Sequence, residues 1–87
     1  MSDKREHFDR TFSQYRGVMF TYKGIEYYMH MNNPVKHCAI DKKNARGDWE
    51  QDFYKFDMLD IMLNAKIFQE RSFLELLEND LFEEYEF

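Results

Sequence analysis

Hydrophobic residues recur along the chain with two different periods, and each period predicts a type of secondary structure. Near the start, Phe8, Phe12 and Tyr15 are spaced as on one face of a helix. We therefore expect a short helix from Asp3 to Tyr15, and Gly17 is suited to end it.

A period of two replaces the helical spacing after this first segment. Over residues 18–31, hydrophobic and aromatic side chains occupy alternate positions, and Lys23-Gly24 interrupts the alternation. Two alternating runs joined by a Gly-containing pair predict a β-hairpin. A turn at Asn32-Asn33-Pro34 and a third antiparallel strand over 35–41 follow, and 42–48 is polar enough to be a loop.

The segment 49–56 fits two patterns, because its aromatic residues match both helical and edge-strand spacing. Its aromatic content favours a strand. Residues 58–63 are almost entirely apolar and predict a short helix, with Asp57 and Asp60 as a weak capping pair and Asn64 at its end.

Ser72 and Glu75 have the spacing of a capping box, in which each side chain accepts a hydrogen bond from the other residue's backbone. The pattern predicts a final helix that begins at Phe73 and continues past Phe82, and its last turn carries Glu83, Glu84 and Glu86. Acids at a helix end oppose its dipole by roughly a few tenths of a kcal/mol each. These acids are therefore expected to be solvated or to contact a basic partner.

These elements predict an α+β fold in a single domain over residues 1–87. A three- or four-stranded antiparallel sheet would pack on one face against the C-terminal helices, with the short N-terminal helix at one end. The predicted core consists of Val18, Phe20, Ile25, Tyr27, Leu59, Leu63, Phe73, Leu77 and Leu81. A core of this size yields only a few kcal/mol of net stability, so a partner or a homodimer would help.

The composition shows an excess of aromatic side chains, and it also bears on where the protein is expected to be located. Nine Phe, six Tyr and one Trp are more rings than a small core hides, so some should be exposed contact residues. One cysteine excludes an internal disulfide. The charged N-terminus has no apolar signal segment, and no apolar run reaches a membrane-spanning length. We expect a soluble, cytoplasmic protein without membrane contact.

The spacing of potential catalytic and metal-binding residues argues against an enzyme. Adjacent His37 and Cys38 would point to opposite faces of a strand, and neither His7 nor His30 has a partner at ligand spacing. Phosphate-binding and nucleophile motifs do not occur, and the chain has only three Gly. We therefore expect no catalytic residue, no metal and no cofactor.

Charge is unevenly distributed along the chain. Residues 1–46 carry nine Lys/Arg and five Asp/Glu, a net of +4, whereas 47–87 carry three and twelve, a net of -9. Spaced carboxylates can occupy a basic groove that normally holds nucleic-acid phosphates. The residues expected to bind such a partner are Asp48, Glu50, Asp52, Tyr54, Glu75, Glu78, Glu83, Glu84, Tyr85 and Glu86. The competing interpretation is ordinary charge for solubility.

Two alternative functions use the aromatic side chains instead. The surplus rings could form the interface of a homo-oligomeric structural or regulatory protein. Alternatively, rings of the hairpin region beside basic residues could stack single-stranded bases, and the rings concerned are Tyr15, Phe20, Tyr22, Tyr27 and Tyr28. A pI near 5.1 argues against direct nucleic-acid binding.

Two motifs resemble short uncharacterised proteins of Gram-positive bacteria and their phages. One is the Y-K-G-I-E-Y-Y run of residues 22–28, and the other is the L-N-A-K-I-F connector with its S-F-L-E helix start, within 56–77. A Gly common in that connector is replaced near Gln69-Glu70. The resemblance implies an accessory protein of a mobile element, and small acidic proteins of that setting include anti-CRISPR inhibitors. The first expectation is thus a phage-encoded, non-enzymatic inhibitor whose partner is a host protein with a basic nucleic-acid channel, such as a CRISPR nuclease.

Overall fold

The computed structural model describes residues 3–32 and 37–86, and it combines a sheet with three helices. The elements in chain order are α1 (Asp3–Tyr15), β1 (Gly17–Tyr22), β2 (Ile25–Asn32), β3 (His37–Lys43), β4 (Trp49–Phe56), α2 (Leu59–Asn64), α3 (Phe73–Glu78) and β5 (Glu84–Glu86). The strands form one antiparallel sheet in the order β4-β3-β2-β1-β5. The predicted α+β class is confirmed, with five strands in place of three or four.

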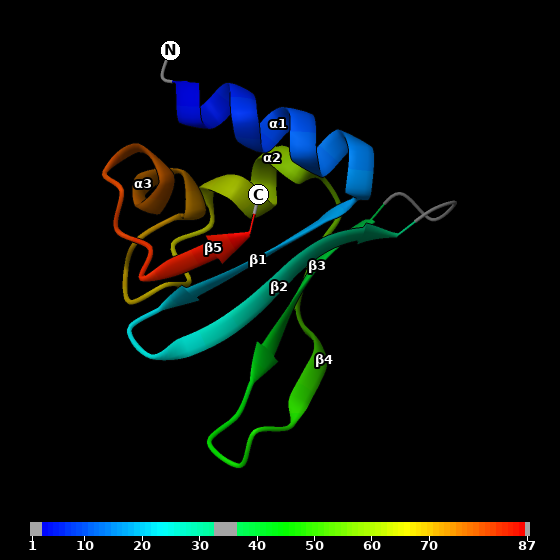
Figure 1. Ribbon diagram of the computed structural model, residues 1–87. Coiled ribbons are helices and arrows are strands. Elements are labelled where there is room, and N and C mark those ends of the chain that lie inside the picture. Colours follow the sequence, from blue (N-terminus) through cyan, green and yellow to red (C-terminus); the bar gives the residue numbers. More distant parts are fainter. Residues whose placement is uncertain (1–2, 33–36, 87) are drawn as a thin grey trace.

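All three helices lie on one side of the sheet (Figure 1). α1 packs on β1 and α3, and α2 packs on β3, β4 and α3. Because a strand sends alternate side chains to opposite faces, this arrangement buries one face and leaves the other uncovered by described elements. The uncovered face is called the outer face below.

The predicted hairpin is confirmed, and both residues of its Lys23-Gly24 turn adopt a left-handed backbone. Lys23 and Gly24 have φ values of 52° and 75°, as in the left-handed two-residue turns that suit twisted strands. Along β1, Val18, Phe20 and Tyr22 are buried while their neighbours are half-exposed. Period two alone therefore located both strands and the face they bury.

β3 and β4 form a second hairpin that extends beyond the helices (Figure 1). The segment 49–56 is a strand, as its aromatic content favoured, and β3 continues to Lys43 rather than ending at Asp41. The predicted turn at Asn32-Asn33-Pro34 and the start of the predicted third strand fall largely outside the described residues.

The final helix is shorter than predicted. α3 ends at Glu78, because Leu81 donates its backbone N–H to Leu76 O (2.9 Å) and Asp80 donates to Leu77 O (3.4 Å). This is a Schellman motif with Asp80 in the left-handed region at φ 54°, a conformation that Asp tolerates better than most residues. The chain then turns back, and β5 pairs with β1.

Two smaller predictions also need correction. Met58, not Asp57, is the N-cap of α2, and it makes no capping side-chain hydrogen bond. Of the predicted core, Ile25, Leu59 and Leu81 are only partly buried, and the other six residues are buried. These three pack at the rim of the core, where a hydrophobic pattern does not distinguish full from partial burial.

Aromatic rings form the centre of the core. Phe20 lies 5.0–5.5 Å, centroid to centroid, from four other rings, those of Tyr27, Phe68, Phe73 and Phe82. On the helical side, Phe8 of α1 reaches Phe73 at 4.8 Å. Interlocked rings at these separations add attraction beyond their buried area. Much of the aromatic surplus is therefore structural.

The capping box at the start of α3 is present in full and makes stability depend on pH. Glu75 N donates to Ser72 Oγ, and Ser72 N donates to Glu75 Oε1, both at 3.2 Å. The hydrogen bond from the Ser72 backbone is the main cause that lowers the pKa of Glu75, and Lys66 at 3.6 Å also lowers it. A lowered folded-state pKa adds stability above the unfolded-state pKa, and this is lost as pH falls through the folded-state value.

We therefore expect acid to weaken the wild type more than Glu75→Gln, which keeps an oxygen acceptor for Ser72 N. Urea unfolding from about pH 6 down to about pH 3 measures the difference. Glu78→Gln is the matched control, because Glu78 is an exposed acid of the same helix. If all three proteins lose stability in parallel, the Ser72–Glu75 contact is not the origin of the pH dependence.

Candidate binding face

The outer face carries polar, charged and aromatic side chains that alternate with the buried residues. Strand register places them in cross-strand rows, because directly paired residues point to the same face. One row begins with Glu84, passes Thr21 and reaches Glu26. It continues with Lys43, whose Nζ lies 3.0 Å from Glu26 Oε2, and ends at Trp49.

The next row contains Glu86, Met19, Tyr28 and Asp41. Glu84 and Glu86 are therefore two residues apart on the edge strand β5 and point to the same side. They line one shallow depression together with Glu26. Strands β5, β1 and β2 thus bring carboxylates that are about 60 positions apart in the sequence to one small area.

A wider hollow of about 330 Å³ lies further along the same face. Four strands contribute to its lining, which consists of Met19, Tyr28, Asp41, Trp49 and Gln51. Apolar walls with a few polar groups are typical of recognition sites. The Tyr28 ring also lies over Gly17, where an added Cβ would be only 2.7 Å from Tyr28 Cζ. A side chain at position 17 would therefore collide with the Tyr28 ring, and only Gly leaves room for it.

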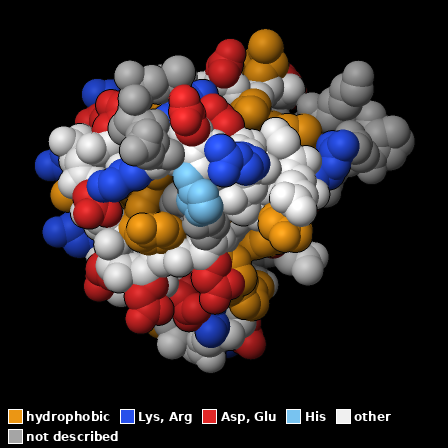
Figure 2. Space-filling model, turned by 45° about the horizontal axis from the view of Figure 1, so that its top comes forward, with side chains coloured by type: hydrophobic (Ala, Val, Ile, Leu, Met, Phe, Trp, Pro, Cys, Tyr) orange, Lys and Arg blue, Asp and Glu red, His pale blue; other side chains and the backbone are white. Residues whose placement is uncertain are grey.

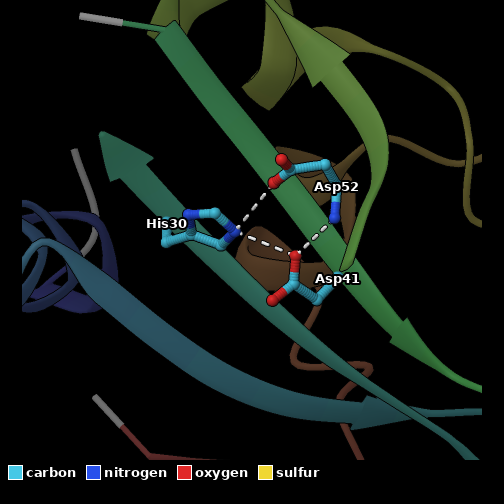
Figure 3. Close-up of polar contacts among 3 residues, drawn as sticks. All are labelled: His30, Asp41 and Asp52. Carbon is cyan, nitrogen blue, oxygen red and sulfur yellow. Dashed lines mark hydrogen bonds and ion pairs between the residues drawn. The ribbon is translucent and has the colours of Figure 1, made fainter. Parts of the chain in front are cut away.

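His30, Asp41 and Asp52 form a polar cluster (Figure 3). Asp41 also lines the hollow, so the cluster borders it. His30 Nε2 lies 2.9 Å from Asp41 Oδ1 and 3.6 Å from Asp52 Oδ1. Asp52 N donates to Asp41 Oδ1 at 2.8 Å. The three side chains point toward one another from β2, β3 and β4, so the cluster links three neighbouring strands.

An irregularity in β4 brings Asp52 into this cluster. The β3–β4 register shifts between Ile40 and Lys42, and Asp52 has a φ of 53°. Such a bulge places extra residues opposite one partner and redirects a side chain. Sequence reasoning missed the cluster because its members lie 11 positions apart, a spacing that no local ligand motif contains.

The ten residues predicted to bind a partner form two blocks in the sequence, a first block within 48–54 and a second block within 75–86. The structure separates the acids of the first block. Asp48 is exposed in the β3–β4 turn, whereas Glu50 faces Lys42 across the ladder. Asp52 belongs to the cluster just described. Tyr54 is only partly exposed and packs against the core. The first block therefore does not present one continuous acidic surface.

The second block divides between two layers. Glu75 is engaged in the capping box, and Glu78 is exposed at the end of α3. Glu83 accepts a hydrogen bond from Gly24 N at 2.6 Å, so it ties the end of the chain to the β1–β2 turn. Tyr85 points to the helical side, 5.9 Å from the Phe82 ring.

Glu84 and Glu86 differ from the other acids of this block. Both are exposed, and no described residue forms an ion pair with either of them. Of the ten residues predicted to bind a partner, only these two lie side by side on the outer face with side chains that form no ion pair or hydrogen bond with any described residue.

Most of the five rings considered for base stacking are buried and cannot contact a nucleic acid. Phe20, Tyr22 and Tyr27 are at most 5 % exposed and lie under the helices, so only Tyr15 and Tyr28 remain accessible. Burial, with Tyr54 and Tyr22 nearby, raises the pKa of Tyr27. Burial likewise raises the pKa of the Cys38 thiol, as expected for a small core residue, and this disfavours its reactive thiolate form.

Turning the helical side forward shows a mixed surface (Figure 2). Acidic side chains form their densest group in the lower part of that view, and hydrophobic side chains appear as small areas between charged ones. A mixed surface of this kind is typical of ordinary solvated charge.

Comparison with family models, with curated proteins and with solved structures found no match to this chain. Among the described residues, no helix has the length and apolar character needed to cross a bilayer.

Proposed function

We propose that this protein is a non-enzymatic binding protein whose outer face engages a basic protein surface. The more specific part of the proposal is that the partner is a nucleic-acid-handling enzyme of a host cell, such as a CRISPR nuclease. The protein would act as a phage-encoded inhibitor that occupies the enzyme's phosphate-binding channel. The observation that carries the proposal is the pair of exposed acids Glu84 and Glu86 on one face of the sheet. They lie beside Glu26, whose carboxylate is already paired with Lys43.

The sheet gives these carboxylates fixed positions. β5 is hydrogen-bonded to β1, and Glu83 anchors the chain just before it through Gly24. Glu84 and Glu86 therefore point outward at a separation of roughly 7 Å between their Cα atoms, two residues along a strand. Preorganised acids lose little freedom on meeting Lys or Arg, with which they form charge-assisted hydrogen bonds.

The hollow beside the acids supplies the apolar part of an interface. Tyr28 lines it at the centre of the sheet, and Trp49 lines it from β4 with 37 % of its surface exposed. Aromatic residues in such positions commonly dominate binding energy, while surrounding charges set orientation and association rate. A basic partner with one apolar side chain in reach of the hollow would use both features.

Charge reversal at Glu84 and Glu86 tests the proposal. We expect the tagged wild-type protein to retain a nucleic-acid enzyme from a Gram-positive host lysate, identified by mass spectrometry. Glu84→Lys/Glu86→Lys should reduce retention at least about tenfold, because attraction becomes repulsion. Raising salt should also release the partner, since exposed ion pairs are screened.

Asp48→Lys/Glu50→Lys is the matched control, with the same change in net charge at acids outside the outer-face group. It should retain the partner. Equal loss in both double variants would mean that net charge alone drives binding. Recovery of no nucleic-acid enzyme would contradict the specific proposal. Binding of free DNA or RNA in a gel shift would instead favour a single-strand binder.

A further inference from the structure

We propose that His30, Asp41 and Asp52 form a site for one divalent transition-metal ion, with Zn²⁺ as the reference ion. The proposal is independent of the partner described above. Each residue offers one ligand atom, and the three atoms lie within 4.8 Å of one another (Figure 3). Imidazole nitrogen and carboxylate oxygen are both established Zn²⁺ ligands.

The distances suit a metal with little rearrangement. Zn²⁺ bonds of about 2.0–2.2 Å in tetrahedral geometry hold neighbouring ligand atoms roughly 3.4 Å apart. The observed separations from His30 Nε2 are 2.9 Å to Asp41 Oδ1 and 3.6 Å to Asp52 Oδ1, which lie on either side of that value. Small side-chain rotations would bring all three atoms onto one ion.

The charges of the cluster also favour a cation. Both carboxylates face the same nitrogen, and a neutral imidazole has only one proton to share between its two nitrogens. Asp41 is partly satisfied by Asp52 N, but the Asp52 carboxylate receives no donor beyond His30 among the described residues. A divalent ion would neutralise two acids that are held close together in a half-buried place.

Neighbouring groups orient the ligands. The His30 ring stacks on Tyr28 at 5.2 Å between centroids with an interplanar angle of 20°. The backbone N–H of Asp52 fixes the Asp41 carboxylate. Supporting contacts of this kind typically contribute about 10- to 100-fold to metal affinity.

The three side chains are exposed enough to admit an ion, and their number leaves one coordination position open. The His30 and Asp41 side chains are each 14 % exposed and that of Asp52 is 35 % exposed, so an ion can enter from solvent. Three protein ligands leave a fourth position for water, in the manner of open zinc sites. Asp41 also lines the hollow, so the cluster borders a solvent-accessible part of the outer face.

Calorimetric titration of Zn²⁺ into the full, untagged, metal-free chain tests the site. We expect one ion per chain for the wild type, and at least about tenfold weaker binding for His30→Gln and for Asp52→Asn. Co²⁺ should give a visible absorption band in the wild type that both variants lose. Mg²⁺ should bind more weakly than Zn²⁺, because Mg²⁺ prefers an all-oxygen shell.

His7→Gln and Asp48→Asn are matched controls, since they make the same changes at exposed positions outside the cluster. Both should bind Zn²⁺ as the wild type does. Failure of the wild type to bind Zn²⁺ with one-to-one stoichiometry would overturn the proposal. Wild-type affinity in Asp52→Asn, whose fold is checked by circular dichroism, would overturn it equally.

Discussion

Phe20→Ala is expected to lower the free energy of unfolding by about 3–5 kcal/mol, the usual cost of emptying a large aromatic site in a core. Phe20 is 2 % exposed and contacts rings from four other segments of the chain. Because those rings belong to β2, the connector before α3, α3 itself and the segment before β5, the cavity would not close by a local shift. Because the core of an 87-residue domain yields only a few kcal/mol of net stability, such a loss would be comparable with the whole of it.

Chemical denaturation followed by circular dichroism measures this loss. Phe53→Ala is the matched control, because Phe53 is 45 % exposed and the change should cost under about 1 kcal/mol. Phe20→Leu keeps most of the volume and provides a measurable intermediate value should the alanine variant remain unfolded. Similar losses for Phe20→Ala and Phe53→Ala would show that the ring cluster is not the centre of the core.

Asp41→Ala is expected to have the second largest effect on stability, a loss of about 1–3 kcal/mol in metal-free buffer. The Asp41 carboxylate is 14 % exposed and accepts hydrogen bonds from the side chain of His30 and the backbone of Asp52. Alanine would leave both donors without that acceptor in a half-buried place. It would also loosen the bulge of β4, because the backbone N–H of Asp52, which has a left-handed backbone, donates to the Asp41 carboxylate.

Asp41→Asn separates the hydrogen bond from the charge, because its amide oxygen can still accept from Asp52 N. We expect it to lose less stability than Asp41→Ala. Hydrogen exchange of the Asp52 amide should accelerate strongly in Asp41→Ala and weakly in Asp41→Asn. Unchanged exchange in the alanine variant would contradict the role given to this contact.

Sequence patterns correctly predicted the elements that depend on interactions between residues close together in the chain. The helical spacing of Phe8, Phe12 and Tyr15 predicted α1 with the observed bounds. Phe8 and Phe12 are buried, whereas Tyr15 at the end of the helix is exposed. Period two predicted β1, β2 and their turn at Lys23-Gly24. The Ser72–Glu75 box predicted the start of α3, because a cap is made within one turn.

Local patterns failed where two structures compete for the same residues. Leu81 and Phe82 fit a continued helix, but Asp80 in the left-handed region ends α3, and the free edge of β1 offers hydrogen bonds to the returning chain. Asn79-Asp80 was the available signal, since both residue types favour helix ends. The acids predicted for a helix terminus therefore lie on an edge strand, where they point to the outer face.

The sequence by itself determined the fold class, the helical and extended periods, the capping box and the excess of acids after residue 46. These depend on neighbours within a few positions. Only the tertiary structure decided which acids share a face, and it alone brought His30, Asp41 and Asp52 together. That meeting depends on the register of three strands and on one bulge, and a one-residue slip would send these side chains to the opposite face.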